Sequence, residues 1–189
     1  RVIDEINKLN PDIVHLHWIN GGMIGLSDLK RINARVFWSL HDMWPFTGGC
    51  HYTLHCDNHN TGCGNCRVLK SGIKNDLSRN LATKKNDIYN QFDPIFIGLS
   101  KWMYNEISNS YIGSNRRIIH VPNLIDISLY RPMQKSTARN SLNLCVDKKY
   151  ILFGAMNATS DSRKGFQFIE KMMLKLDAMH ELLVFGAKD

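Results

Sequence analysis

Long hydrophobic runs are absent from this sequence of 189 residues. The longest apolar stretches, such as residues 13–19 and 150–156, fall far short of the ~20 residues that a helical membrane span needs. The first residues also lack the basic region, apolar run and small-residue cleavage site of a secretory signal peptide. We therefore expect no transmembrane helix and no signal peptide, and we expect a cytoplasmic protein.

Runs of four or more basic residues, internal repeats and low-complexity segments are also missing. Lys and Arg number 24 against 17 Asp and Glu, which gives a formal net charge of +7. Such a charge favours anionic partners: nucleic acid, phosphorylated ligands or an acidic membrane surface. Because the basic residues are spread along the chain, the pattern favours a diffuse basic surface over a dedicated polyanion-binding patch.

The composition is that of a globular chain. Hydrophobic residues make up 43% and charged residues 22%, which excludes the disordered, collagen-like and mucin-like classes. A chain of this length can form one domain or two small ones. It begins with Arg1, and its last apolar run, residues 182–185, leads into Gly186 as a strand leads into a further element. We expect a fragment of a longer protein.

Apolar periodicity predicts alternating strands and helices. Predicted strands occupy residues 13–18, 35–40, 95–99, 118–121, 150–154 and 182–185. Predicted helices occupy residues 23–33, 76–91, 101–108 and 165–177, with Asp76 and Ser100 as N-caps. This alternation is typical of an α/β fold with a mostly parallel sheet. The extended stretch 122–132 is a candidate domain boundary.

A cysteine-rich loop, residues 43–67, interrupts this rhythm. It carries four of the five cysteines in the pattern C-x5-C-x6-C-x2-C: Cys50, Cys56, Cys63 and Cys66. Three histidines lie nearby, and zinc takes four tetrahedral sulfur or nitrogen ligands, so the pattern favours a structural Zn²⁺ that closes the loop. Free thiols and disulfides are the alternatives. Because the sequence shows no secretory signal, disulfides are the less favoured of these two.

A non-enzymatic alternative follows from the same loop. A zinc-stapled module could bind nucleic acid or a protein partner with the help of the positive charge. However, no Lys or Arg lies between Asp42 and Cys66, whereas nucleic-acid-binding fingers carry basic residues nearby. We therefore expect no nucleic-acid partner, and we keep the binding module as the second hypothesis.

Three segments together resemble glycosyltransferase family 4. They are Ser39-Leu40-His41-Asp42-Met43-Trp44-Pro45-Phe46-Thr47-Gly48-Gly49-Cys50, then Val121-Pro122-Asn123-Leu124-Ile125-Asp126 with Tyr130-Arg131-Pro132, then Phe153-Gly154-Ala155 with Arg163-Lys164-Gly165-Phe166. The first is especially similar to transferases of surface polysaccharide assembly, of the colanic acid, capsule and O-antigen type.

This resemblance implies the GT-B architecture of two Rossmann-like domains. Residues 1–135 would be a nearly complete N-terminal acceptor-side domain, and residues 136–189 the start of a C-terminal domain that binds the nucleotide-sugar. The implied reaction is retaining transfer of a sugar from a UDP- or GDP-linked donor, without a catalytic metal. The implied acceptor is a lipid-linked glycan in bacterial surface polysaccharide biosynthesis. We therefore expect peripheral contact with the cytoplasmic face of the inner membrane.

The resemblance also assigns roles to residues. His41 follows a predicted strand, where open α/β sheets bind ligands, and it would contact the donor sugar as the catalytic residue. Arg163 and Lys164 would bind the donor diphosphate at a helix N-terminus. Asp42, Trp44 and Asn123 are candidates for the cleft and the acceptor.

The sequence departs from the family pattern at several positions. Leu124 stands where the family often has glycine, and Ala155 where many members have an arginine that contacts the diphosphate. The C-terminal pair of glutamates eight residues apart is not present, and the late glutamates, Glu170 and Glu181, are eleven apart. We expect that pair beyond Asp189 and expect this fragment to be inactive by itself.

Overall fold

The computed structural model describes residues 2–186. The chain divides into two compact units, unit 1 (Arg1–Leu124) and unit 2 (Ile125–Asp189). Sequence analysis placed the boundary between residues 135 and 136, eleven residues further along the chain. The assignment of the two units to acceptor and donor domains stays a prediction.

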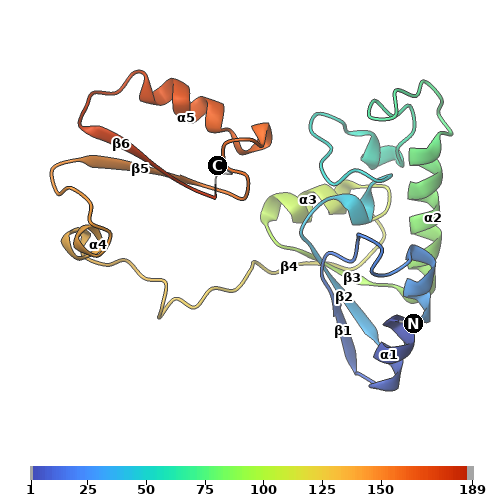
Figure 1. Ribbon diagram of the computed structural model, residues 1–189. Helices are drawn as coiled ribbons and strands as arrows, with labels where there is room; N and C mark the ends of the chain where they lie inside the picture. Colours follow the sequence, from blue (N-terminus) through green and yellow to red (C-terminus); the bar gives the residue numbers. More distant parts are fainter. Residues whose placement is uncertain (1, 187–189) are drawn as a thin grey trace. The chain divides into compact units, whose positions relative to one another are not determined.

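Unit 1 contains a parallel sheet of four strands in the order β1-β2-β3-β4 (Figure 1). The strands are β1 (Ile13–Leu16), β2 (Arg35–Leu40), β3 (Ile95–Gly98) and β4 (Ile118–His120). The helices are α1 (Val2–Lys8), α2 (Leu77–Phe92) and α3 (Lys101–Asn109), with 3-10 helices η1 (Leu26–Arg31), η2 (Trp44–Phe46) and η3 (Asn58–Thr61). The predicted α/β class with a parallel sheet is confirmed.

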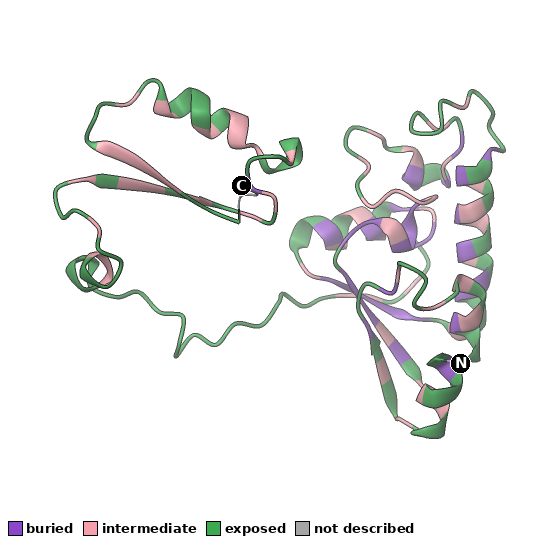
Figure 2. Ribbon diagram, in the orientation of Figure 1, coloured by how far each residue is buried: buried purple, intermediate pink, exposed green. Residues whose placement is uncertain are grey.

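The core of unit 1 lies between the sheet and the helices, where Figure 2 shows the buried residues. Trp38 of β2 and Phe96 of β3 are fully buried, and so is Tyr89 of α2. The three rings contact one another at centroid distances of 5.6 to 5.9 Å. Burial of large aromatic side chains contributes most of the hydrophobic stabilisation of such a core.

Both predicted helix caps are confirmed. The Asp76 carboxylate accepts hydrogen bonds from the backbone N–H groups of Ser78 and Arg79 at the start of α2. The Ser100 hydroxyl accepts one from the backbone N–H of Met103 at the start of α3. Each cap satisfies donors that the first helical turn leaves without a partner.

The predicted helix over residues 23–33 is wrong. Gly21 and Gly22 both have positive φ, and the regular part is only the six-residue 3-10 helix η1. The apolar residues with helical spacing are nevertheless buried, Leu29 fully and Ile32 nearly so. Apolar periodicity indicates which side chains are buried. A short 3-10 segment can bury side chains at this spacing as well as an α-helix can.

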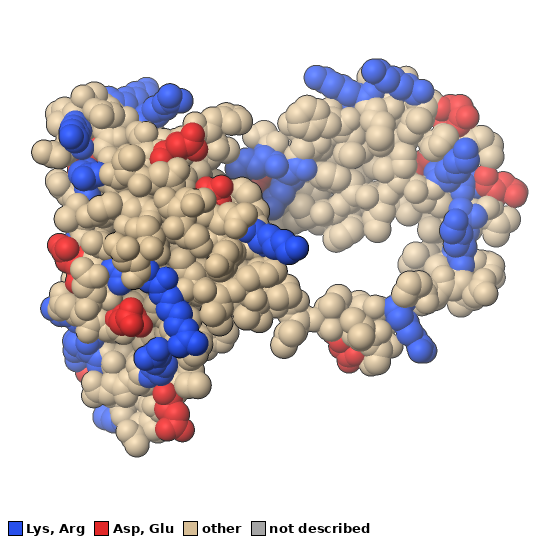
Figure 3. Space-filling view, turned by 180° about the vertical axis from the view of Figure 1, so that it is seen from behind, with Lys and Arg blue, Asp and Glu red and all other residues tan. Residues whose placement is uncertain are grey.

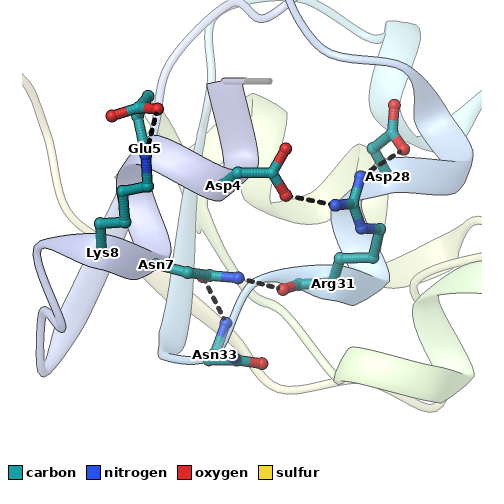
Figure 4. A network of polar contacts seen from close by, with 7 residues as sticks. All are labelled: Asp4, Glu5, Asn7, Lys8, Asp28, Arg31 and Asn33. Atoms are coloured by element: carbon teal, nitrogen blue, oxygen red, sulfur yellow. Dashed lines mark hydrogen bonds and ion pairs between the residues drawn. The ribbon is translucent and has the colours of Figure 1, made fainter.

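Sequence analysis also missed α1, which polar contacts attach to η1 (Figure 4). The Arg31 guanidinium forms ion pairs with Asp4 of α1 and with Asp28. The Asn7 side chain donates to the Arg31 carbonyl oxygen at 2.7 Å and accepts from the Asn33 backbone N–H at 3.0 Å. These contacts, together with the buried Ile3, fix a helix of only seven residues that would be marginal alone.

Unit 2 is built on two parallel strands, β5 (Lys149–Gly154) and β6 (His180–Phe185). Its helices are α4 (Lys135–Ser141), which sequence analysis missed, α5 (Phe166–Met173) and the 3-10 turn η4 (Ser162–Lys164). The helix predicted over 165–177 is shorter than expected: α5 begins after Gly165, which is left-handed with φ 82°, and it ends at Met173.

Lys and Arg side chains lie in separate places over both units on the face shown in Figure 3, with Asp and Glu side chains among them. This distribution agrees with the diffuse basic surface expected from the sequence. Within residues 2–186, no helix combines the length and the apolar character needed to cross a membrane.

Candidate functional site

Two histidines meet just beyond the carboxyl ends of β1 and β2. His17 Nδ1 lies 2.8 Å from His41 Nε2, so one ring donates its proton to the other. The parallel register pairs Leu16 with Trp38, and this brings together the residues that follow each strand. Both histidines are exposed. Each can therefore present its outer ring edge to a bound ligand, at the edge where open α/β sheets bind ligands.

A third histidine extends this group. The rings of His15 and His17 lie with their centroids 4.2 Å apart, and His15 Nε2 lies 2.9 Å from the Ser39 hydroxyl. Partial burial, followed by the neighbouring His17 and His41, lowers the pKa of His15 below its ordinary value. The neighbouring imidazoles therefore disfavour the protonated form of His15.

Asp42 is buried and holds the loop behind the histidines. Its carboxylate accepts from the Trp18 indole N–H at 3.0 Å and from the Trp44 backbone N–H at 2.9 Å. His51 Nδ1 lies 2.6 Å from the same carboxylate and bridges to the cysteine-rich loop. Asp42 therefore positions neighbouring groups, and its oxygens are already engaged by them.

The predicted site residues His41, Asp42 and Trp44 line one pocket with Trp18 and Ser39. The accessible volume of this pocket is about 10 Å³, which is room for about one water molecule. Their proposed roles in sugar transfer stay predictions. A pocket of this size can accept a single polar group, such as one hydroxyl, and cannot enclose a sugar.

Lys85 of α2 is fully buried beneath the Trp44 loop. Its ammonium donates to the carbonyl oxygens of Trp44 and Thr47, the latter at 2.9 Å. Burial lowers the pKa of Lys85 to about 7, while Cys63, Asp42 and Cys50 act in the opposite direction. Sequence analysis missed this residue, because its neighbour Lys84 is an ordinary exposed lysine and only the tertiary structure distinguishes the two.

The four clustered cysteines line a second pocket, of about 20 Å³, together with His59 and Ser78. All four are free thiols and half-buried. Burial and the neighbouring Cys66 and Cys56 raise the pKa of Cys50. Burial raises the pKa of Cys63 as well, although the Gly48 backbone N–H donates to its sulfur at 3.2 Å.

Among residues 2–186, no group of three or more His, Cys, Asp or Glu side chains has the spacing of a metal site. The four thiols share one pocket without converging on a single point. Zinc binding by this loop therefore stays a prediction.

The predicted diphosphate-binding residues lie in unit 2, before α5. Arg163 forms a two-point ion pair with Asp161 of its own loop, at 2.9 and 2.6 Å. Lys164 is exposed and belongs to the 3-10 turn η4, so the expectation that it opens a helix is wrong. Asn123 is exposed near the end of unit 1 and is not among the residues that line the His41 pocket.

Sequence analysis did not name His17 as a site residue. Both His15 and His17 are exposed residues in the structure. The signal that could have found His17 is its position immediately after β1, which parallel pairing places beside the end of β2.

No family model matches this chain. It is similar to the Escherichia coli (strain K12) protein named "Putative colanic acid biosynthesis glycosyl transferase WcaC", with 26% identity over 124 residues. The match covers 58% of this chain and 31% of that protein, so the chain spans about a third of its relative's length. The relative's name describes the same class of enzyme that the three sequence segments resemble.

Proposed function

We propose that this chain is part of a glycosyltransferase that acts in the synthesis of a bacterial surface polysaccharide. The observation that carries the proposal is the similarity to the colanic acid glycosyl transferase. The pair of histidines at the carboxyl edge of a parallel sheet supports it, because this is where an open α/β sheet places a ligand. The finer assignment is a retaining GT-B enzyme of family 4 that uses a UDP- or GDP-linked sugar.

In this proposal His41 contacts the donor sugar. Its ring is held by the His17 ring at 2.8 Å, which fixes the orientation of the imidazole. A neutral imidazole can hydrogen-bond a sugar hydroxyl and stabilise the positive charge that develops near the anomeric carbon. Trp44 and the buried Asp42 hold the loop that follows His41, and this geometry limits the space beside the ring to one small polar group.

The donor diphosphate is assigned to unit 2. Lys164 supplies an exposed positive charge in the turn before α5. Arg163 is held by Asp161, so a diphosphate would have to compete with that carboxylate for the guanidinium. We therefore assign the larger share of diphosphate binding to Lys164. The acceptor hydroxyl, on a lipid-linked glycan, would be the nucleophile.

The test is a sugar-transfer assay with the longest protein that the gene encodes, because the match covers only part of the relative. A panel of UDP- and GDP-sugars is incubated with a lipid-linked acceptor extract, and glycan products are identified by mass spectrometry. We expect one donor to be consumed. We expect His41→Ala to lower kcat by about 100-fold or more, and His55→Ala, at an exposed position, to retain activity.

Transfer by His41→Ala at the wild-type rate would remove His41 from the proposed mechanism. If no nucleotide-sugar is consumed or bound, the glycosyltransferase proposal is wrong. In that case the second hypothesis, a binding module stapled by the cysteine-rich loop, would take its place. Steep salt dependence of binding to an anionic polymer would distinguish that module from a nucleotide-sugar site.

A further inference from the structure

The cysteine-rich loop carries the strongest unexplained chemistry in the described chain. Its four cysteines are up to sixteen positions apart in the chain, and the fold brings all four residues to the lining of one pocket. The fifth cysteine, Cys145, is exposed and lies in unit 2. The clustering is therefore a property of the loop, and Cys145 serves as a natural internal control.

The backbone around the pocket is held in place from several sides. The Gly48 N–H donates to Cys63 Sγ at 3.2 Å, and the Cys66 N–H donates to the Asp76 carboxylate at 2.9 Å. Cys63 itself adopts the left-handed conformation, with φ 63°, between two glycines of positive φ. The Gly48 N–H would stabilise a thiolate at Cys63, as such contacts do around metal-bound cysteines.

A buried positive charge lies beside the same pocket. The Lys85 ammonium is bonded to two neutral carbonyl oxygens, of Trp44 and Thr47, and the Thr47 residue lines the cysteine pocket. A buried ammonium is stabilised by negative charge nearby. The groups able to carry negative charge that act on Lys85 are Cys63, Asp42 and Cys50. Two of these three belong to the cluster, so a metal ion that holds these sulfurs as thiolates would place negative charge near the Lys85 ammonium.

We propose that Cys50, Cys56, Cys63 and Cys66 bind one Zn²⁺ as a structural tetrathiolate site, and that buried Lys85 is a positioning residue that offsets part of its negative charge. Four thiolates around Zn²⁺ carry a net charge of minus two. Binding releases the four S–H protons to solvent. The metal would close the irregular cysteine-rich loop, which lies between His41 and α2.

The site forms by side-chain rotation in this proposal. The described side chains do not yet have the spacing of a metal site, whereas tetrahedral zinc requires each sulfur about 2.3 Å from the ion. A cysteine sulfur moves by rotation about a single bond, and all four cysteines line the same small pocket. Convergence therefore needs no rearrangement of the surrounding helices.

The test measures zinc directly in the purified 189-residue chain. Metal content is determined by mass spectrometry after exhaustive dialysis, and Co²⁺ is then substituted to give the absorption spectrum of tetrahedral thiolate ligation. We expect about one metal ion per chain, with Cys145→Ser unchanged and Cys63→Ser depleted. The Co²⁺ spectrum of the wild-type chain decides the ligand set even if Cys63→Ser does not fold.

Lys85 has its own matched pair of variants. Lys85→Met removes the buried charge, and Lys84→Met removes the neighbouring exposed one. Competition with a chelator should show zinc affinity lowered by about 10- to 100-fold in the first variant and unchanged in the second. Equal affinities in Lys85→Met and the wild type would overturn the role of Lys85.

Two results would overturn the metal site itself. One is a metal-free chain whose four loop thiols all react with a thiol reagent at the same rate with and without added Zn²⁺. The other is a mass decrease that shows disulfides within the loop of the freshly isolated chain. Neither result bears on sugar transfer, which is tested separately through the donor and His41.

Discussion

The Nζ atom of Lys85 lies 3.6 Å from the centre of the Trp44 ring. The same ammonium donates to the Trp44 carbonyl oxygen. One lysine of α2 therefore contacts both the ring and the backbone of Trp44, which follows His41 in the chain. A cation over an indole face is stabilised more when it is desolvated, and Lys85 is fully buried while Trp44 is half-buried. This relationship connects the cysteine-rich loop to the proposed sugar-binding edge.

Replacing Lys85 should destabilise unit 1. Lys85→Met keeps the length of the side chain but leaves the carbonyl oxygens of Trp44 and Thr47 without their buried donor. We expect a loss of about 1–3 kcal/mol in the free energy of unfolding, measured by urea titration followed by circular dichroism. Lys84→Met should change it by less than about 0.5 kcal/mol. Similar midpoints for the two variants would show that the buried contacts are unimportant.

Asp42 should act through position rather than by direct chemistry. Asp42→Asn preserves the shape but loses the charge that attracts the Trp18 indole and the His51 ring. We expect unfolding free energy to fall by about 1.5–3 kcal/mol, and the affinity for donor sugar to weaken with it. The exposed Asp87→Asn is the control. Retention of full stability by Asp42→Asn would contradict this role.

The His15 ring should titrate below the ordinary histidine value of 6.5. Its folded-state pKa is lowered, so the unfolded chain binds the proton more readily and the folded state loses stability as pH falls through about 6.5. The titration can be followed by NMR of the ring carbon protons. His17→Ala should raise the His15 midpoint, because it removes one of the charges that oppose protonation. A midpoint above 6.5 in the wild-type chain would refute the prediction.

Gly48 should not tolerate a side chain. A Cβ atom there would lie 2.3 Å from the Ser78 carbonyl oxygen in the first turn of α2, and backbone at this position cannot move aside cheaply. We expect Gly48→Ala to cost about 1–3 kcal/mol of stability, measured by thermal unfolding. Gly72→Ala, where a Cβ would meet nothing within 4 Å, is the matched control. Equal melting temperatures would show that the loop can shift.

The sequence by itself determined the parallel α/β class, most strand positions, and the caps at Asp76 and Ser100. These features depend on local patterns: apolar runs bounded by turn residues, and side chains that bond to the nearest free N–H groups. The grouping of His41, Asp42 and Trp44 was also predictable, because they are neighbours in the chain and follow one strand. The short helices α1 and α4 were missed because their local sequence signals are weak. Contacts with residues distant in sequence hold α1 in place.

Only the tertiary structure decided which residues from other elements join these groups. His17 reaches His41 because β1 and β2 are parallel neighbours, so the residues that follow both strands lie at the same edge of the sheet. Lys85 is distinguished from Lys84 because one face of α2 packs under the Trp44 loop. The four cysteines share a pocket because η2, η3 and the cap of α2 fold the loop back on itself. Such contacts depend on the register of strands and the rotation of helices, which are properties of packing and leave no local mark in the sequence.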